Sequence, residues 1–175
     1  RSFGEITENM SATLSGSEAG LYGYWPLDEG TGDLALDKTA SRNATVNADW
    51  LLQPGGFSWE LTGTNYLSIN STNILIGAET DMTVEFWFRG NNTGAVQGLF
   101  SNGLGDGTDV YTGIESAMAI IADVSGQIHV MSNGYDFQGT SDSYMDGDWH
   151  HLAFVVDRKS TAKLYVDGNL KNSTN

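Results

Sequence analysis

The segment DGDWHHLAFVVDRKSTAKLYVDG at residues 146–168 contains two adjacent histidines among several aspartates. Histidine exchanges protons near neutral pH and binds metals, and aspartate oxygens bind hard cations. Successive side chains of a strand point to opposite faces, so in a strand His150 and His151 diverge and cannot bind one metal ion together. The pattern favours a structural role for both histidines over a ligand-binding role for one of them.

The elements that position these residues are predicted to be the two strands of one hairpin. WHHLAFVVD at 149–157 is the first strand and AKLYVDG at 162–168 is its antiparallel partner, connected by the turn DRKST. The aspartates fall at strand ends and turns, where aspartate commonly bonds to nearby backbone groups. These are Asp146, Asp148, Asp157 and Asp167.

The clearest single strand is MTVEFWFR at residues 82–89. One of its faces carries Val84, Phe86 and Phe88, and the other carries Thr83, Glu85, Trp87 and Arg89. Large apolar residues on one face predict packing against a second layer. Three tryptophans are expected to be buried in strands, namely Trp25, Trp87 and Trp149.

The composition limits the possible partners. Eight basic residues against 22 acidic ones give a formal net charge of −14, which opposes binding to nucleic acid and to anionic membrane surfaces and favours cations. Cysteine is absent, which excludes disulfides, thiolate metal sites and a cysteine nucleophile. No stretch approaches the length of apolar sequence that a membrane-spanning helix needs.

Short strand-like runs between glycine-rich turns recur along the chain and predict an all-β domain. One short helix is expected at residues 3–14, where apolar residues recur at spacings of three and four. The runs at 57–61 and 65–69 are interpreted as a hairpin or as a strand and its return. Further strands are expected at residues 21–28, 99–103, 117–124 and 127–132.

Three segments, in this order and spacing, resemble a laminin-G-like, or concanavalin A-like, jelly-roll module. They are YGYWPLDEGTGDLALDKTASRNATV at 22–46, MTVEFWFRGNNTGAVQGLFSNG at 82–103 and GDWHHLAFVVDRKSTAKLYVDG at 147–168. The resemblance covers about residues 20–170. It implies an all-β sandwich of two packed antiparallel sheets, with ligands held at loops along the rim or on a concave face.

The two ends of the chain depart from this family pattern. Family members continue with further strands after the YVDG hairpin, so we expect a longer polypeptide or another segment to supply the missing C-terminal strands. Residues 1–19 resemble the helix and linker that join tandem modules, which leaves 20–175 as the domain. A helix that packs on its own domain is the alternative. Because the chain begins with Arg1, we expect it to be cut from a longer precursor.

Calcium is the cofactor that the loops favour, because hard cations bind oxygen ligands from Asp, Asn and backbone carbonyls. A first cluster contains Asp28, Asp37 and Asn43, in a region that often forms a structural calcium site in the resembling family. A second cluster contains Asp106 and Asp109 in a glycine-rich loop. The alternatives are that the first cluster caps turns and that the second is a solvated loop.

Carbohydrate binding calls for exposed aromatic rings beside polar side chains. The candidates in loop-like, polar surroundings are Tyr111, Tyr135, Phe137 and Tyr144. Glucanases of this general architecture place closely spaced carboxylates along one strand, because an acid and a nucleophile flank one glycosidic bond. The strand at 82–89 offers Glu85 alone, so we expect no enzymatic activity.

The family resemblance, together with the tandem-like junction at residues 1–19, implies a non-catalytic binding or adhesion module of a large secreted or cell-surface bacterial protein. Its expected partners are a surface glycan or protein, neighbouring modules of the same polypeptide and secretion machinery, with no nucleic acid and no membrane insertion. Two alternatives stay open. The first is an accessory carbohydrate-binding domain of a secreted polysaccharide-degrading enzyme. The second is a spacer repeat or secretion passenger without a ligand.

Overall fold

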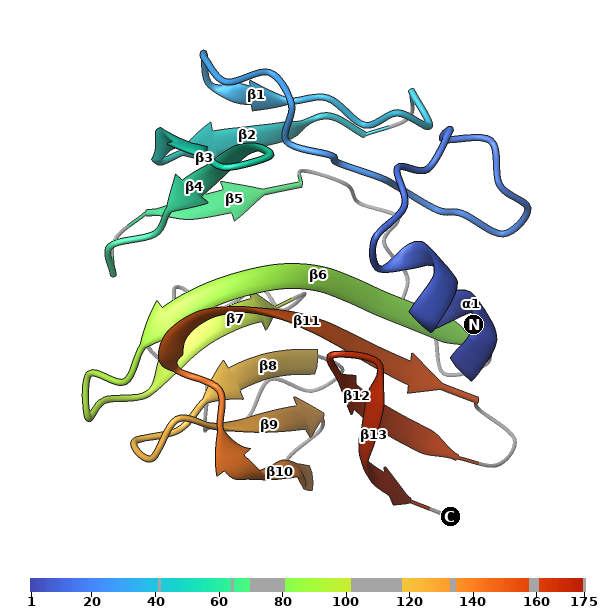
Figure 1. Ribbon diagram of the computed structural model, residues 1–175, viewed down its shortest axis with the longest axis vertical. Helices are drawn as coiled ribbons and strands as arrows, with labels where there is room; N and C mark the ends of the chain where they lie inside the picture. Colours follow the sequence, from blue (N-terminus) through green and yellow to red (C-terminus); the bar gives the residue numbers. More distant parts are fainter. Residues whose placement is uncertain are drawn as a thin grey trace. The chain divides into compact units, whose positions relative to one another are not determined.

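The computed structural model describes residues 1–40, 42–63, 65–69, 81–101, 118–132, 135–157 and 161–174, with residues 132 and 135–138 described by their backbone alone. The chain divides into two compact units (Figure 1). The first comprises Arg1–Met10 and Ile76–Asn175, and the second comprises Ser11–Leu75. Among the described residues, no helix has the length and apolar character needed to cross a membrane.

Two four-stranded antiparallel sheets form the first unit, with strand orders β13–β12–β11–β6 and β10–β9–β8–β7 (Figure 1). The first sheet contains β6 Met82–Asn91, β11 Asp146–Val156, β12 Ala162–Val166 and β13 Asn169–Thr174. The second contains β7 Gln97–Ser101, β8 Met118–Ala122, β9 Gln127–Ser132 and β10 Tyr135–Ser143. This arrangement confirms the predicted all-β sandwich of antiparallel sheets.

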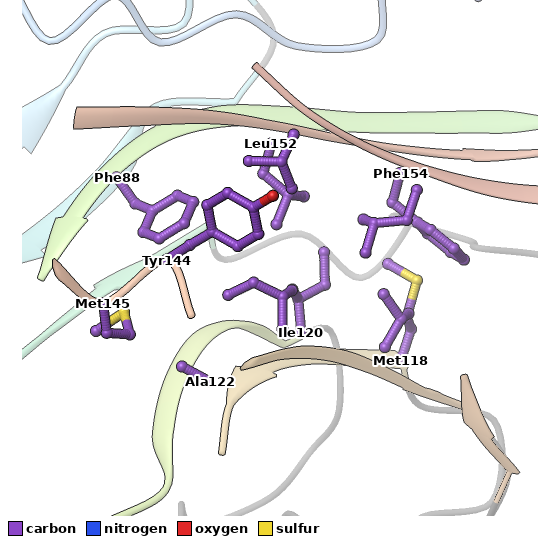
Figure 2. Packing of buried hydrophobic residues seen from close by; sticks show 12 residues of the cluster. Phe88, Met118, Ile120, Ala122, Tyr144, Met145, Leu152 and Phe154 are labelled. Carbon is purple, nitrogen blue, oxygen red and sulfur yellow. The ribbon is translucent and has the colours of Figure 1, made fainter. Parts of the chain in front are cut away.

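The core of this unit lies between the two sheets (Figure 2). Leu152 and Phe154 project from β11 toward Ile120 and Met118 of β8, and each of these side chains is buried. Leu152 and Ile120 have no exposed surface. Burial of one such side chain contributes about 1.5–3 kcal/mol, so the alternation of apolar residues along β11 is sufficient to fix its inner face.

The short helix α1, Phe3–Asn9, packs on the opposite face of the β13–β12–β11–β6 sheet. A capping box begins it, in which the Ser2 hydroxyl accepts the Glu5 N–H and the Glu5 carboxylate accepts the Ser2 N–H. Ile6 is fully buried against Ala153 and Tyr165. The helix thus covers strands of its own chain.

The helix is shorter than the predicted 3–14. The carbonyl of Met10 accepts a hydrogen bond from the Trp87 indole N–H at 2.9 Å, and that carbonyl is the group to which a continuing helix would bond Leu14. A tertiary contact therefore occupies the position where the helical hydrogen-bond pattern would have continued.

The second unit contains a three-stranded sheet, β1–β2–β5, and a two-stranded sheet, β3–β4. The bounds are β1 Leu34–Ala35, β2 Ala44–Asn47, β3 Asp49–Gln53, β4 Gly56–Glu60 and β5 Tyr66–Ser68. The buried residues Ala35, Ala44 and Val46 form its core, against which Trp50 and Trp59 pack. The two indole rings meet edge to face, with centroids 5.0 Å apart.

The predicted hairpin of residues 57–61 with 65–69 is wrong, because β4 pairs with β3 and β5 pairs with β2. The chain reverses instead at Pro54 and Gly55, which link Gln53 to Gly56 in a two-residue turn. Gly55 has a φ of 99°. Proline followed by glycine suits such a turn, since proline presets its own φ and glycine accepts a positive one.

The predicted strand at 21–28 is also wrong, because none of these residues joins a β-ladder. The backbone N–H of Tyr24 donates to the Asp37 carboxylate at 2.9 Å, and its carbonyl accepts the Lys38 N–H at 2.8 Å. Pro26 has no N–H to offer, and Leu27 has a φ of 61°. The backbone hydrogen bonds of Tyr24 are therefore made to the Asp37 side chain and the Lys38 backbone, and not to a partner strand.

Elsewhere the expected strands are confirmed within a few residues. The hairpin of 149–157 with 162–168 appears as β11 paired with β12, with Leu152 opposite Val166. The segment around residues 135–143 was expected to be a loop and forms β10, which pairs with β9.

Candidate functional site

Four aromatic residues were predicted to bind carbohydrate, and the structure describes the side chain of one, Tyr144. Its ring is 7% exposed and lies in the core beside Phe88 (Figure 2). This burial corrects the expectation of a solvent-facing ring at position 144. Tyr135 and Phe137 lie in β10 and not in a loop, and their side chains, like the whole of Tyr111, fall outside the described residues.

The predicted calcium ligand Asp37 is a buried acceptor for the loop around it. One carboxylate oxygen accepts the backbone N–H groups of Tyr24 and Thr39, both at 2.9 Å. The other accepts the Thr39 hydroxyl at 2.6 Å and the Arg42 N–H at 3.0 Å. Burial raises the pKa of Asp37, but these hydrogen bonds outweigh burial and leave the pKa below its ordinary value.

The other ligands of the first predicted calcium cluster also have protein partners. The Asp28 carboxylate lies 3.2 Å from the Lys38 ammonium, and the Asn43 side-chain oxygen accepts the Asp37 N–H at 3.2 Å. Among the described residues, no group of three His, Asp or Glu side chains converges to hold a metal ion. The donor set around Asp37 therefore does not fit a bound ion as the loop stands. The second predicted cluster lies outside the described residues: Asp106 and Asp109.

His150 is held between two carboxylates on the inner face of β11. Its Nδ1 lies 2.9 Å from Asp167 Oδ2, and its Nε2 lies 3.1 Å from Asp146 Oδ1. Both ring nitrogens donate to these acceptors when the imidazole is protonated. Burial lowers the pKa of His150, but the hydrogen bonds to Asp167 and Asp146 outweigh burial and raise the pKa above its ordinary value.

His151 lies on the opposite face, as the alternation predicted. The residue is 3% exposed, and its ring packs at a tilt against Trp87, with centroids 5.3 Å apart. Nε2 lies 3.9 Å from Glu85 Oε2, beyond hydrogen-bond distance. Burial lowers the pKa of His151 and raises the pKa of Glu85, although Arg1, with its side chain 2.9 Å from that carboxylate, opposes the second shift. Each histidine thus serves the packing of its own face.

The face of the β13–β12–β11–β6 sheet directed away from the sandwich core, here called the outer face, displays two solvent-accessible indole rings. Trp87 is 46% exposed and Trp149 is 40% exposed, which corrects the expectation that both are buried. The Arg89 guanidinium lies 5.2 Å from the Trp149 ring centroid, in a cation–π contact. In the ladder, Arg89 pairs directly with Trp149, and His151 pairs with Trp87.

A signal for this surface was present in the sequence. Trp87 shares its face of β6 with Glu85 and Arg89, and two charged residues on a face indicate solvent rather than core. The size and apolar character of tryptophan favoured burial, whereas the charged neighbours of Trp87 indicated the solvent exposure that is observed.

A model of the concanavalin A-like lectin/glucanases superfamily matches residues 61–175 of the chain. No curated protein matches it. Among solved structures, the binding domain of Paraclostridial Mosquitocidal Protein 1 is similar with a TM-score of 0.61 and 14% identity, over 82% of this chain and 38% of that one.

Two further similar structures are botulinum neurotoxin domains. The receptor binding domain of the C/D mosaic serotype has a TM-score of 0.58 and 16% identity, over 87% of this chain and 39% of that one. The binding domain of neurotoxin DC, in complex with rat synaptotagmin II, has a TM-score of 0.56 and 10% identity, with the same coverage of 87% and 39%. This chain spans about two fifths of the length of each of the three structures, and identities this low show a shared fold alone. Because the family model matches more than half of the sequence, and because the sandwich agrees with it, the chain belongs to the concanavalin A-like lectin/glucanases superfamily.

Proposed function

We propose that this chain is a non-catalytic binding module of a large exported or cell-surface protein, and that it recognises a glycan or protein on another surface. The outer face carries this proposal, because Trp87 and Trp149 expose 46% and 40% of their surface on two adjacent strands, β6 and β11. Exposed large apolar groups of this kind mark interaction sites, and Trp and Arg supply much of the binding energy where partners meet.

The three similar structures support a binding role in general terms, since each is described as a binding domain and one was solved with synaptotagmin II. Their ligands are not carried over to this chain, because fold likeness does not specify a ligand. The residues that would select a partner here are those of its own outer face.

Calcium remains part of the proposal, although Asp37 has no unused acceptor in the described loop. Calcium titration followed by thermal unfolding tests it, since an ion that binds the folded chain raises the midpoint. An ion at the first cluster loses its effect in Asp28→Asn, and an ion at the second loses it in Asp106→Asn. An unchanged midpoint in the wild-type chain contradicts calcium binding.

The binding role is tested by screening the purified chain on a glycan array and on an array of extracellular proteins, with and without a chelator. We expect reproducible binding to at least one class. The matched control is Leu152→Ala, which removes a core side chain and is expected to reduce every signal in proportion to the fraction unfolded. Absence of any signal from the folded chain contradicts the binding role, and turnover of a bound glycan contradicts its non-catalytic character.

A further inference from the structure

We propose that the outer face around Trp87 and Arg89 binds an acidic saccharide, whose ring stacks on the indole and whose carboxylate or sulfate meets the guanidinium. This inference rests on the proposed binding function and names the chemical class of its ligand. It assigns recognition to the interior of β6 and β11, whereas the sequence had indicated the loops.

The Trp87 ring is exposed and also fixed in orientation. Its indole N–H donates to the Met10 carbonyl at 2.9 Å, and its ring packs against His151 at a centroid distance of 5.3 Å. These two contacts hold one edge and one side of the ring, while 46% of the residue surface stays accessible. A ring that is already immobilised loses little conformational entropy when a ligand stacks on it.

Trp149 extends this surface across the strand pair. Trp87 lies opposite His151, and Trp149 lies opposite Arg89 two residues further along the ladder, so the two tryptophans are diagonal neighbours on one face. Such neighbours stand about 7–8 Å apart, within reach of large side chains. One ligand can therefore contact both indoles and the guanidinium between strands β6 and β11.

Arg89 contributes one positive charge to this surface. Among the described residues, Arg89 has a cation–π contact with Trp149 and no carboxylate partner. The carboxylate on the same face of β6, Glu85, is paired with Arg1 at 2.9 Å. A net charge of −14 repels anions at long range, so an unpaired guanidinium here is a short-range site for one anionic group.

The groups around Trp87 and Arg89 suit a saccharide. The aliphatic residues of the same face, Ala153 and Val155, pack with Ile6 of α1. Phe3 and Leu170, which lie beside Tyr165 of this sheet, are also exposed. A stable protein interface buries about 800 Å² on each partner around an apolar centre. Two rings beside one cation are a smaller site, with a flat apolar platform for the C–H face of a sugar and a charged group for its substituent.

The probes for the test are sialyllactose, a glucuronate-containing oligosaccharide and a sulfated oligosaccharide, each compared with a neutral counterpart such as lactose. A short oligoglutamate peptide represents an acidic protein partner. Calorimetry and tryptophan fluorescence measure binding to the folded chain. We expect at least one acidic saccharide to bind about tenfold more tightly than its neutral counterpart.

Four variants locate the site. Trp87→Ala is expected to weaken binding by at least about tenfold, and Trp87→Phe, which keeps a ring, by less. Arg89→Gln is expected to remove the preference for the acidic probe and to leave neutral binding unchanged. Val124→Ala, an exposed residue of the turn between β8 and β9, is the matched control and is expected to bind as the wild type does. Near-ultraviolet circular dichroism confirms that each variant is folded.

Three outcomes overturn the inference: acidic probes that bind no better than neutral ones, binding within twofold of wild type in both Trp87→Ala and Arg89→Gln, or an oligoglutamate that binds as tightly as the saccharide. Each leaves the proposed function standing if the arrays give a signal. Absence of binding on every glycan and protein array contradicts both proposals.

Discussion

Nδ1 of His150 lies 2.9 Å from Oδ2 of Asp167, across 17 residues of sequence. The same carboxylate accepts the backbone N–H of His151 at 2.9 Å through its other oxygen, and the Asp167 N–H donates to the His151 carbonyl at 2.8 Å. Asp167 and Gly168 form a two-residue turn with φ values of 51° and 71°. Asp167 therefore joins the β12–β13 turn to β11.

Substitutions at Asp167 separate the charge of this contact from its turn geometry. Asp167→Asn keeps an acceptor and tolerates a positive φ, so we expect a loss of about 1 kcal/mol from the weaker bond to His150. Asp167→Ala loses both acceptors and disfavours the left-handed conformation, and is expected to cost roughly 1–2 kcal/mol more. Urea unfolding measures both values, and equal midpoints for the two variants would contradict this role.

The pH dependence of stability follows from the shifted groups. The folded pKa of His150 is raised, so its contribution is complete below its ordinary value of about 6.5 and is lost as the pH rises through the folded pKa. A backbone hydrogen bond from Asp148 and the contact with His150 lower the pKa of Asp146. The Asp146 contribution is present above about pH 3.9 and is lost as the pH falls through the lowered pKa.

The contribution of His150 is therefore expected to be largest between about pH 4 and 6.5. Comparison of the wild type with His150→Gln isolates it, because the other histidines are common to both proteins. The difference in unfolding midpoint should be greatest inside this window and should shrink toward alkaline pH. A difference that is independent of pH would show that the imidazole acts by packing alone.

The sandwich core predicts a contrast between two leucines. Leu152 has no exposed surface, so Leu152→Ala is expected to cost about 2–5 kcal/mol through lost burial and a residual cavity. Leu170 is 52% exposed, and Leu170→Ala is expected to change stability by about 0.5 kcal/mol or less. Chemical denaturation of the two variants checks this. Similar costs at both positions would mean that the core is misplaced.

Two strand glycines are expected to differ in their tolerance of alanine, because one is closely packed and the other is not. A Cβ at Gly139 of β10 would meet the Leu164 side chain and lie 2.8 Å from the Ile128 carbonyl oxygen, whereas a Cβ at Gly98 of β7 meets nothing within 4 Å. Gly139→Ala is expected to cost about 1–3 kcal/mol by overpacking. Gly98→Ala is expected to be neutral or slightly stabilising. A neutral effect at Gly139 would show that β10 lies further from β12.

Substitution of Asp37 is expected to destabilise the protein more than substitution of Asp28. Asp37→Asn places an NH₂ group against donors, namely the Thr39 hydroxyl or the Arg42 N–H, and is expected to destabilise the second unit by roughly 2–3 kcal/mol. Asp28→Asn loses an exposed pair with Lys38 and is expected to cost about 0–1 kcal/mol. Hydrogen exchange of the loop amides measures both, and equal protection in both variants would contradict the role of Asp37.

Alternation along strands was sufficient to predict β6, β11 and β12, because each buries one face in a sandwich and its sequence repeats every two residues. The faces of His150 and His151 followed from that repeat alone. The strand β10, Tyr135–Ser143, was missed because its residues are mostly polar or glycine, and a register shift interrupts its pairing with β9.

Local patterns could not provide contacts between distant segments. The exposure of Trp87 depends on which side of β6 the core occupies, and its orientation depends on Met10, 77 residues away. Likewise, the segment around Tyr24 has the alternation of a strand, but its hydrogen bonds go to Asp37 and Lys38. The hydrogen-bond partner of a backbone group depends on the tertiary structure, and the periodicity of the sequence does not specify it.

The packing of Ile6 against Ala153 and Tyr165 has a consequence during synthesis on the ribosome. At about 5–20 residues per second, the ribosome needs on the order of ten seconds after synthesis of α1 to synthesise the strands on which α1 packs. During that interval the apolar side of α1 has no partner, and a short helix alone is marginal in water. A chain truncated ahead of Ala162, where β12 begins, lacks the Tyr165 surface on which that helix docks.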